Sequence, residues 1–469
     1  MMEWNDEVGP VGPHTAASVE ELRSVSNPSP RRLVDELLGR WWIGASLLVA
    51  AVILPLLRQR GTASWQTIWP EDGKVYTEQA IGSGLGTVLR GYGGYLQLPP
   101  RLLALPTPYF SLRYLALYIS LSSALVGAPL AWSVYHLSRG WVSSRLVRLV
   151  LASFAVLMPS LGWEIPGVMA NTIWVFMAAL PWALISMEET PWNVTLRAVL
   201  AFLGATSSVL SLLFLPLSLG WLAYRRTRST LIVAGSYFVG AVVQVGVTAA
   251  SGGPSNHFPV HRTVSELGGD LAWRMFGVFL LGPRWATDLA FSGWRWVVVY
   301  LAPLLVLALL ALAARGVRRR AQVMAGAFAA LAVVFYVVAV WGRGTDQIVI
   351  WANVYFDQRY AVVPVMLLAS AFAILIAPTG CSLRRSVTRI GTPTFVAVTV
   401  LLIVVSFPVT TIRSFDPPWT TRVEQVEVDH CDRAPSSTIV IIPNDMFSPF
   451  WPLGPNGTNP VTVRCSNIG

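Results

Sequence analysis

Two adjacent carboxylates, Glu71 and Asp72, lie in a stretch that reads Trp-Pro-Glu-Asp-Gly-Lys-Val-Tyr. An apolar run over 41–57 comes shortly before them. At the end of a membrane-crossing run, an acid would lie at the lipid headgroups, where it can accept a proton from a hydroxyl group. The same pair could hold a divalent cation such as Mg²⁺, Mn²⁺ or Ca²⁺. Acids are also common at helix N-termini, so a capping role for Glu71 stays open.

Basic and aromatic residues suited to a phosphate ligand lie close to other apolar runs. Tyr95 and Arg101 belong to the segment Gly-Tyr-Gly-Gly-Tyr-Leu-Gln-Leu-Pro-Pro-Arg, and Arg359 and Tyr360 directly precede an apolar run. A guanidinium can grip a phosphate through two parallel hydrogen bonds. Either arginine could equally be an anchor that extends its charged end to the membrane interface.

Glu164, Asn171 and Trp174 form a third group, around a turn between two apolar runs. A carboxylate, an amide and an indole suit a sugar, because they offer hydrogen bonds to hydroxyl groups and a flat surface for the ring. The alternative is a turn shaped by packed aromatic residues. His257 and His261 lie in a later loop without a carboxylate at metal-ligand spacing, so we expect no zinc site there.

The composition indicates the class of protein to which these residues belong. Hydrophobic residues make up 54% of the chain and charged residues only 12%, against about a quarter in soluble proteins. This leaves too little polar surface for a water-soluble globule. We predict an all-α polytopic integral membrane protein with about eleven transmembrane helices. The predicted spans are 41–57, 113–137, 149–166, 170–187, 195–209, 210–224, 229–249, 296–314, 321–341, 361–378 and 394–412.

The orientation follows from arginine clusters, because cytoplasmic loops carry an excess of positive charge. The pattern places the N-terminus in the cytoplasm and the C-terminus outside, and it requires two crossings within 195–224 with a break near 204–208. The loop over 187–193 is an exception, with two acids and no arginine. Arginines in the cytoplasmic loops account for the net charge of +10, so the charge does not indicate that the protein binds nucleic acid. The cytoplasmic clusters are Arg31, Arg32 and Arg40; Arg139, Arg145 and Arg148; Arg225, Arg226 and Arg228; Arg315, Arg318, Arg319 and Arg320; and Arg384, Arg385 and Arg389.

Three regions follow from this topology: a polar cytoplasmic tail over 1–40, a transmembrane domain over 41–412, and a small extracytoplasmic tail over 413–469. The last contains two strand-like pieces, 438–442 and 461–464. It also contains Cys431 and Cys465, which could form a disulfide on the oxidising side, whereas Cys381 should stay reduced.

The first outer loop carries apolar residues on one helical face, which predicts a helix that lies in the membrane interface. An ordinary solvated helix is the alternative. Glu78, on the same helix as Asp72, is expected to face water. The apolar face consists of Tyr76, Ala80, Leu85, Val88 and Leu89.

Paired acids after the first span, followed by a helix next to the membrane, resemble the type C (GT-C) glycosyltransferases. Glu71 and Asp72 match the acidic motif of these polytopic enzymes, which use sugars linked to polyprenyl phosphate. A second segment is similar to a bacterial subgroup through Gly94, Tyr95, Leu96, Pro100 and Arg101. The chain departs from the large members of the family, because only a short tail follows its last span.

The resemblance implies a plasma-membrane enzyme that moves a sugar from polyprenyl phosphate to a cell-envelope glycan, glycolipid or protein on the outer face, with inversion at the anomeric carbon. Asp72 would be the catalytic base, with Glu71 as its neighbour or, together with it, as a ligand of the cation. The partners would be the lipid-linked sugar, the acceptor and membrane lipids. The substrate would be bound by Tyr95, Arg101, Glu164, Asn171, Trp174, Arg359 and Tyr360.

Other functions stay open at this level. An envelope polymerase or ligase of another fold would use the loop over 251–294, which contains His257 and His261. A lipid flippase or transporter would show internal repeats and polar groups at mid-membrane, and the sequence has neither. A non-catalytic scaffold is the remaining alternative.

The predicted orientation can be tested with reporter fusions. We expect fusions after Arg148 and Arg228 to report a cytoplasmic position, like those after Arg320 and Arg389, because arginine clusters stay inside. Fusions after Gly94, Pro259 and Asp432 should report an external position. An external report after Arg228 would show that 195–224 crosses once and would invert all later spans.

Overall fold

The structure is a computed structural model that describes residues 41–158, 167–253, 263–343, 359–379, 385–431, 433, 438–441 and 461–465. The predictions for the 1–40 tail, Glu164, His257, His261 and Cys381 lie outside the described residues. The chain divides into two units, Met1–Leu47 and Leu48–Gly469. The first contributes the beginning of helix α3, and the second contains all the features discussed below.

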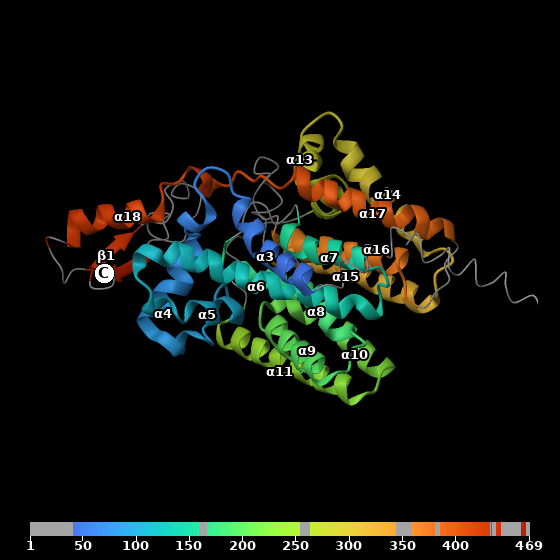
Figure 1. Cartoon of the computed structure of the whole chain (residues 1–469), viewed down its shortest axis with the longest axis horizontal. Helices are drawn as coiled ribbons and strands as arrows, with labels where there is room; N and C mark the ends of the chain where they lie inside the picture. The colour runs from blue at the N-terminus through green and yellow to red at the C-terminus, as the bar shows by residue number, and fades with distance from the viewer. Residues whose placement is uncertain are drawn as a thin grey trace, which may run out of the picture. The chain divides into compact units, whose positions relative to one another are not determined.

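Helices dominate the described residues (Figure 1), and each predicted span overlaps one of them. Five segments are long and apolar enough to cross a membrane, which suggests a multi-pass membrane protein: Leu112–Gly140, Arg228–Ala250, Val297–Ala314, Arg319–Trp341 and Arg359–Ile376. The helices that match the predicted spans are α3 (Trp41–Leu57), α6 (Leu115–Leu137), α7 (Arg145–Leu157), α8 (Thr172–Ile185), α9 (Pro191–Ala205), α10 (Leu215–Tyr224), α11 (Arg228–Ala250), α14 (Ala302–Ala314), α15 (Arg319–Arg343), α16 (Arg359–Ile376) and α17 (Arg385–Val405).

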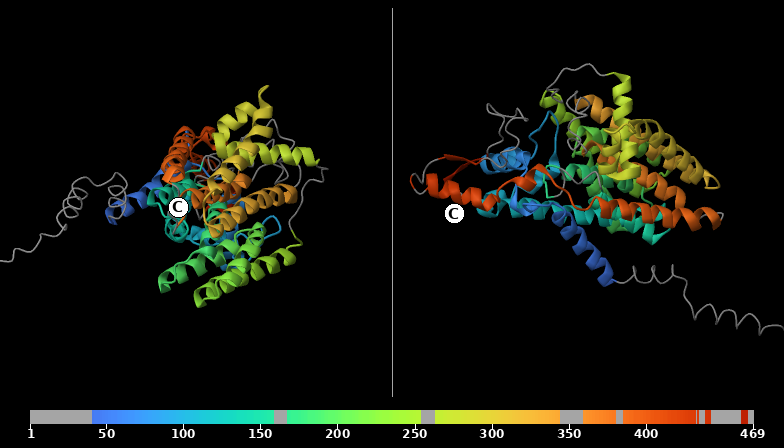
Figure 2. Two further views of the ribbon diagram at one scale, coloured as in Figure 1. Left: turned by 90° about the vertical axis from the view of Figure 1, so that its right-hand side faces the viewer. Right: turned by 90° about the horizontal axis from the view of Figure 1, so that it is seen from above.

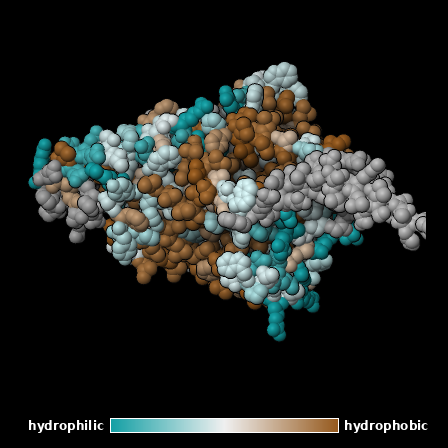
Figure 3. All heavy atoms as spheres, viewed as in Figure 1, coloured by the Kyte–Doolittle hydropathy of each residue, from teal (hydrophilic) through white to brown (hydrophobic). Residues whose placement is uncertain are grey.

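Hydrophobic side chains cover α3, α6 and the region of α14 and α17 on the face shown in Figure 3. Helices α8 and α16 differ, because every residue of each is buried. A helix that is apolar all round belongs in a core rather than at a surface. These two helices therefore form the centre around which α6, α7, α9 and α15 pack.

Helices α9 and α10 confirm that the 195–224 segment contains two helices rather than one. Helix α9 ends at Ala205, a short turn follows, and the next helical segment begins at Val209. At the turn, the Leu98 amide donates to the Thr206 carbonyl at 3.0 Å. At the other end, Arg225 forms an ion pair with Glu189 at 3.0 Å. The chain thus returns to the loop from which α9 started.

Arg58 joins three helix ends. Its buried guanidinium donates to the carbonyls of Met158 at 3.2 Å, Ser406 at 3.1 Å and Phe407 at 3.3 Å. These carbonyls follow α7 and α17, and Arg58 itself follows α3. A cation is favourable there, because helix C-termini carry partial negative charge. Helices α3, α7 and α17 therefore end together, at what we call the Arg58 end.

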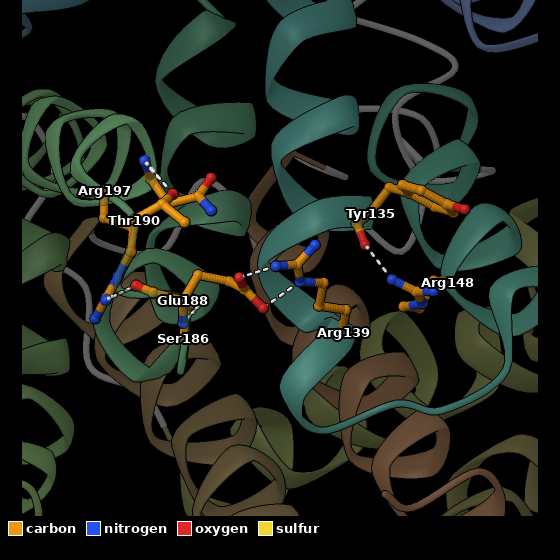
Figure 4. Close-up of polar contacts among 8 residues, drawn as sticks. Tyr135, Arg139, Arg148, Ser186, Glu188, Thr190 and Arg197 are labelled. Carbon is orange, nitrogen blue, oxygen red and sulfur yellow. Dashed lines mark hydrogen bonds and ion pairs between the residues drawn. The ribbon is translucent and has the colours of Figure 1, made fainter. Parts of the chain in front are cut away.

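The ends of α6 and α8 and the starts of α7 and α9 meet around Arg139, in contacts shown in Figure 4. Arg139 forms an ion pair with Glu188 through two nitrogens, and Arg197 donates to the Glu188 carbonyl at 2.8 Å. Arg148 donates to the Tyr135 carbonyl at 3.4 Å. The acids in the loop over 187–193 are thus neutralised by arginines of neighbouring loops. We call this the Arg139 end.

The first loop, residues 58–112, departs from the predicted continuous amphipathic helix. It contains a π-helical turn at Asp72–Thr77, then α4 (Glu78–Ser83), a 3-10 turn at Gly84–Thr87 and α5 (Leu98–Ala104). The single apolar face is wrong, because the chain breaks after Ser83. Tyr76 and Ala80 are buried inside the protein, whereas Leu85 and Leu89 are 78% and 60% exposed.

The tail packs against the first loop to form one layer with its own apolar cluster. Trp419, at the start of α18 (Trp419–Val426), donates through its indole nitrogen to the Leu112 carbonyl at 2.7 Å. Thr462 donates its amide to Glu78 at 2.9 Å. Glu78 also pairs with Lys74 at 2.9 Å, and its side chain is 25% exposed, so it faces water only in part. The first loop and the tail are each too short to form an apolar core alone, and together they form this one.

The predicted strands are confirmed as an antiparallel pair, β1 (Thr438–Ile441) and β2 (Val461–Arg464). The predicted disulfide between Cys431 and Cys465 is also confirmed, and both sulfur-bearing residues are buried in the shared apolar cluster. Helices α12 (Val264–Asp270) and α13 (Val278–Ala290) complete the described helical segments.

The disulfide predicts the pattern of thiol labelling. Without reductant, a thiol reagent should modify only Cys381 in denatured protein, because the other two cysteines are bonded to each other. Reduction should loosen the tail by about 2–4 kcal/mol, since the unfolded tail regains loop entropy. Protease sensitivity of the tail, measured beside that of the helices, checks this. Labelling of all three cysteines before reduction would contradict the bridge.

Candidate functional site

Asp72 lies fully buried at the start of the π-helical turn Asp72–Thr77. Its carboxylate accepts two backbone hydrogen bonds from another part of the chain. The Met169 amide donates to Oδ2 at 3.0 Å, and the Ala170 amide donates to Oδ1 at 2.7 Å. The carboxylate is therefore fixed between the first loop and the segment that leads into α8.

The turn before α8 owes its shape to Gly167. This residue has a φ of +66°, and a Cβ there would lie 2.8 Å from Ser120 Oγ and 3.1 Å from Ser64 Cβ. Ser120 Oγ, on α6, donates to the Ser64 carbonyl at 2.8 Å and to the Gly167 carbonyl at 3.2 Å. Only glycine fits both this crowded space and the left-handed conformation. The turn at Gly167 thereby directs the Met169 and Ala170 amides toward Asp72.

Burial sets the acidity of Asp72. Removal from water raises the pKa of its carboxyl group to about 7, against the opposing effect of the Ala170 and Met169 amides. The negative charge of Glu71, itself buried, raises the pKa further, and the positive charge of Arg413 lowers it. A carboxyl group with such a pKa changes its charge near neutral pH.

Arg413 is a site residue that the sequence did not reveal. It is fully buried, its guanidinium lies 5.7 Å from the centre of the Trp69 ring, and burial lowers its pKa to about 10. Its charge acts on Asp72, since the chain after α17 runs beside the first loop, where the Thr62 amide donates to the Ser414 carbonyl at 3.0 Å. Its only signal in the sequence is its place as the first charge after the last apolar run.

Four further predicted residues contact one another in a row that begins beside the Asp72 contact. Asn171 directly follows Ala170, and its Oδ1 accepts a hydrogen bond from the Trp174 indole at 3.2 Å. The Trp174 ring meets the Tyr360 ring edge to face, with centroids 5.2 Å apart. Arg359 lies 5.5 Å from the centre of that Tyr360 ring. The structure therefore joins two predicted groups that are remote in the sequence, and all four residues are buried.

Arg101 and Tyr95 have a different place. Arg101 is 1% exposed, donates to the Val75 carbonyl at 3.1 Å and to Gln79 at 2.6 Å, and stacks over the Tyr76 ring at 5.2 Å. An exposed interfacial position for Arg101 is therefore wrong. The backbones of Tyr95 and Tyr92 form two hydrogen bonds with each other, in which each amide donates to the other residue's carbonyl. Arg101 therefore supports the π-helical turn that carries Asp72.

The predicted divalent cation has a poor fit to the described side chains. Within the described ranges, no group of three or more histidine, cysteine, aspartate or glutamate side chains comes together. Both oxygens of Asp72 already accept an amide hydrogen. Divalent cations such as Ca²⁺ take six or more oxygen ligands, so we derive no step through a metal.

Comparison with known proteins adds no assignment. No protein-family model matches this sequence, and no curated protein is significantly similar to it. The geometry around Asp72 is therefore the ground on which a function rests.

The electrostatic contact between Asp72 and Arg413 predicts coupling. Arg413→Met should destabilise the protein, because it removes a cation from a buried carboxylate. Asp72→Asn should reduce that loss, with a coupling of about 0.5–3 kcal/mol in a double-mutant cycle. Thermal unfolding in detergent measures each variant. Asp429, an exposed acid, provides the control, and its Asn variant should act additively with Arg413→Met. If Asp72→Asn and Arg413→Met also acted additively on the stability, the electrostatic interaction between Asp72 and Arg413 would be contradicted.

Proposed function

We propose that this chain is a membrane glycosyltransferase of the GT-C type. It transfers a sugar from a polyprenyl-phosphate donor to a hydroxyl group of a cell-envelope glycan, glycolipid or protein. The observation that carries the proposal is the buried carboxyl group of Asp72, with a pKa near neutrality, in the first loop after the first span. A general base works best when its pKa lies near the working pH.

The chemistry is a single displacement. The hydroxyl oxygen of the acceptor attacks the anomeric carbon from the face opposite the phosphate, and the bond between that carbon and the phosphate oxygen breaks. The hydroxyl proton passes to the Asp72 carboxylate, and polyprenyl phosphate leaves with the electron pair of the broken bond. The product carries an inverted anomeric centre, and Asp72 later returns the proton to water.

The surrounding residues have complementary roles in this proposal. Asn171 and Trp174 offer an amide and an indole for the sugar, and they follow the amides that hold Asp72. Arg359 supplies positive charge for the donor phosphate, beside Tyr360. The amides of Met169 and Ala170 keep the base in place. Because Asp72 is fully buried, a hydroxyl group reaches it only when part of its cover moves.

The arrangement of the helix ends supports the orientation that this function needs. In the proposed topology about eleven spans run from a cytoplasmic N-terminus to an extracytoplasmic C-terminus in the plasma membrane. Three of the spans that would leave the cytoplasm, α3, α7 and α17, finish together at the Arg58 end. Arg139 and Arg225, from two of the arginine-rich loops, form ion pairs with the acids of the 187–193 loop at the Arg139 end. Asp72 then lies on the outer side, with the tail.

Substitution of Asp72 tests the proposal. Asp72→Asn retains size and shape but removes the proton acceptor, so sugar transfer from a polyprenyl-phosphate donor in membranes should fall by about 10²–10⁴-fold. Asp429→Asn, which changes an exposed acid, should transfer sugar at the wild-type rate. If Asp72→Asn stays folded and active, the catalytic assignment fails. If the wild type transfers no sugar, an envelope ligase or a transporter becomes the better reading.

The pH dependence separates a base from a structural carboxylate. The wild-type rate should rise with pH and level off above about 7, because only ionised Asp72 accepts a proton. Glu71→Gln should shift this rise to lower pH, since it removes the negative charge that raises the pKa of Asp72. A purely structural Asp72 would give a Glu71→Gln profile that superimposes on the wild type. Added chelator should leave both profiles unchanged if no cation takes part.

A further inference from the structure

A groove of about 660 Å³ lies between α9 and α11, far along the chain from Asp72. Helix α9 provides one wall, from Pro191 to Leu203, and α11 provides the other, from Arg228 to Ser236. The volume falls in the range of about 300–1,000 Å³ that is usual for small-molecule sites. The two helices lie side by side in Figures 1 and 2.

The two helices pack closely around Gly240 of α11, beside the groove. A Cβ on Gly240 would lie 2.8 Å from Ala205 Cβ and 2.9 Å from the Phe202 carbonyl, so the backbones nearly touch there. One helical turn earlier in α11, Ser236 Oγ donates to the Ala198 carbonyl at 2.7 Å. The groove follows this line of contact, from Phe202 and Leu203 at one end to Pro191 and Arg228 at the starts of the two helices.

The walls and the mouth of the groove differ in chemistry. The walls are aliphatic and partly open to the surroundings, with Val199 and Ile232 exposed by 49% and 54%. Arg228 and Ser229 line the mouth, where α11 begins. The helix N-terminus adds partial positive charge to that of the guanidinium. An elongated apolar ligand with an anionic head group fits this combination.

We propose that the groove binds one anionic phospholipid of the surrounding bilayer. An acyl chain lies between α9 and α11, and the phosphate group meets Arg228 and Ser229. The apolar helices place the protein in a membrane, where an outward-facing groove meets acyl chains. The charge at the mouth selects an anionic head group over a zwitterionic one. This site lies toward the Arg139 end and is independent of the proposed sugar transfer.

The test uses the full-length protein in detergent with added phosphatidylglycerol or phosphatidylcholine of identical acyl chains. Native mass spectrometry and thermal unfolding report binding. The wild type should bind phosphatidylglycerol about fivefold more tightly, the usual effect of one arginine at a membrane surface. Arg228→Gln should abolish this preference and retain phosphatidylcholine. Arg319→Gln, at an exposed arginine outside the groove, should keep the preference.

Filling the groove tests the acyl-chain part. Ala198→Phe should weaken the binding of both lipids. If that variant does not fold, Val199→Trp, at a half-exposed position of the groove, serves in its place. Equal binding of the two lipids by the wild type would overturn the head-group assignment. Unchanged lipid binding in the filled variants would overturn the site. A wild-type dimer that these variants dissociate, without bound lipid, would show that a second copy of the chain occupies the groove.

Discussion

The hydrogen bonds from Met169 and Ala170 to the buried Asp72 carboxylate connect the first loop to the core of the helical region. A carboxylate removed from water needs such donors, because burial without them costs several kcal/mol. The amides belong to the turn before α8, a helix that is buried throughout, and α8 meets α16 through Trp174 and Tyr360. The position of the first loop therefore follows from the packing of the two central helices.

The end of the chain closes this arrangement from the other side. The Arg58 guanidinium donates hydrogen bonds to carbonyls that follow α7 and α17. The residues after Arg58 form backbone hydrogen bonds with the segment around Arg413. The tail then covers the first loop through Trp419 and Thr462. The first loop and the tail thus form one layer from two short segments, and the disulfide between Cys431 and Cys465 holds one of them.

The acidity of Asp72 carries a cost in stability. Burial raises its pKa to about 7, above the value of about 4 for an aspartate in an unfolded chain. The folded protein then holds this proton more tightly than the unfolded chain, so the free energy of unfolding falls as the pH rises from about 4 to about 7. Above that range the full cost remains, and Arg413 and the two amides offset part of it. A residue with only a structural role could avoid this cost by being neutral.

The sequence alone indicated a helical chain of the multi-pass membrane type, the helices of the predicted spans, the break within 195–224, both strands and the disulfide partners, because hydrophobic length and turn residues are local properties of the chain. It also indicated Asp72, through its place after the first apolar run. It predicted one apolar helical face where the chain breaks after Ser83, and it left open whether Arg101 binds a phosphate or anchors the chain at the membrane interface. Only the tertiary structure decided that Arg413 and the Met169 and Ala170 amides reach Asp72, since these contacts join residues about a hundred or more positions apart and depend on how α8, α16 and α17 pack. The acidity of the carboxyl group was likewise beyond the sequence, because it is set by burial, which no local pattern encodes.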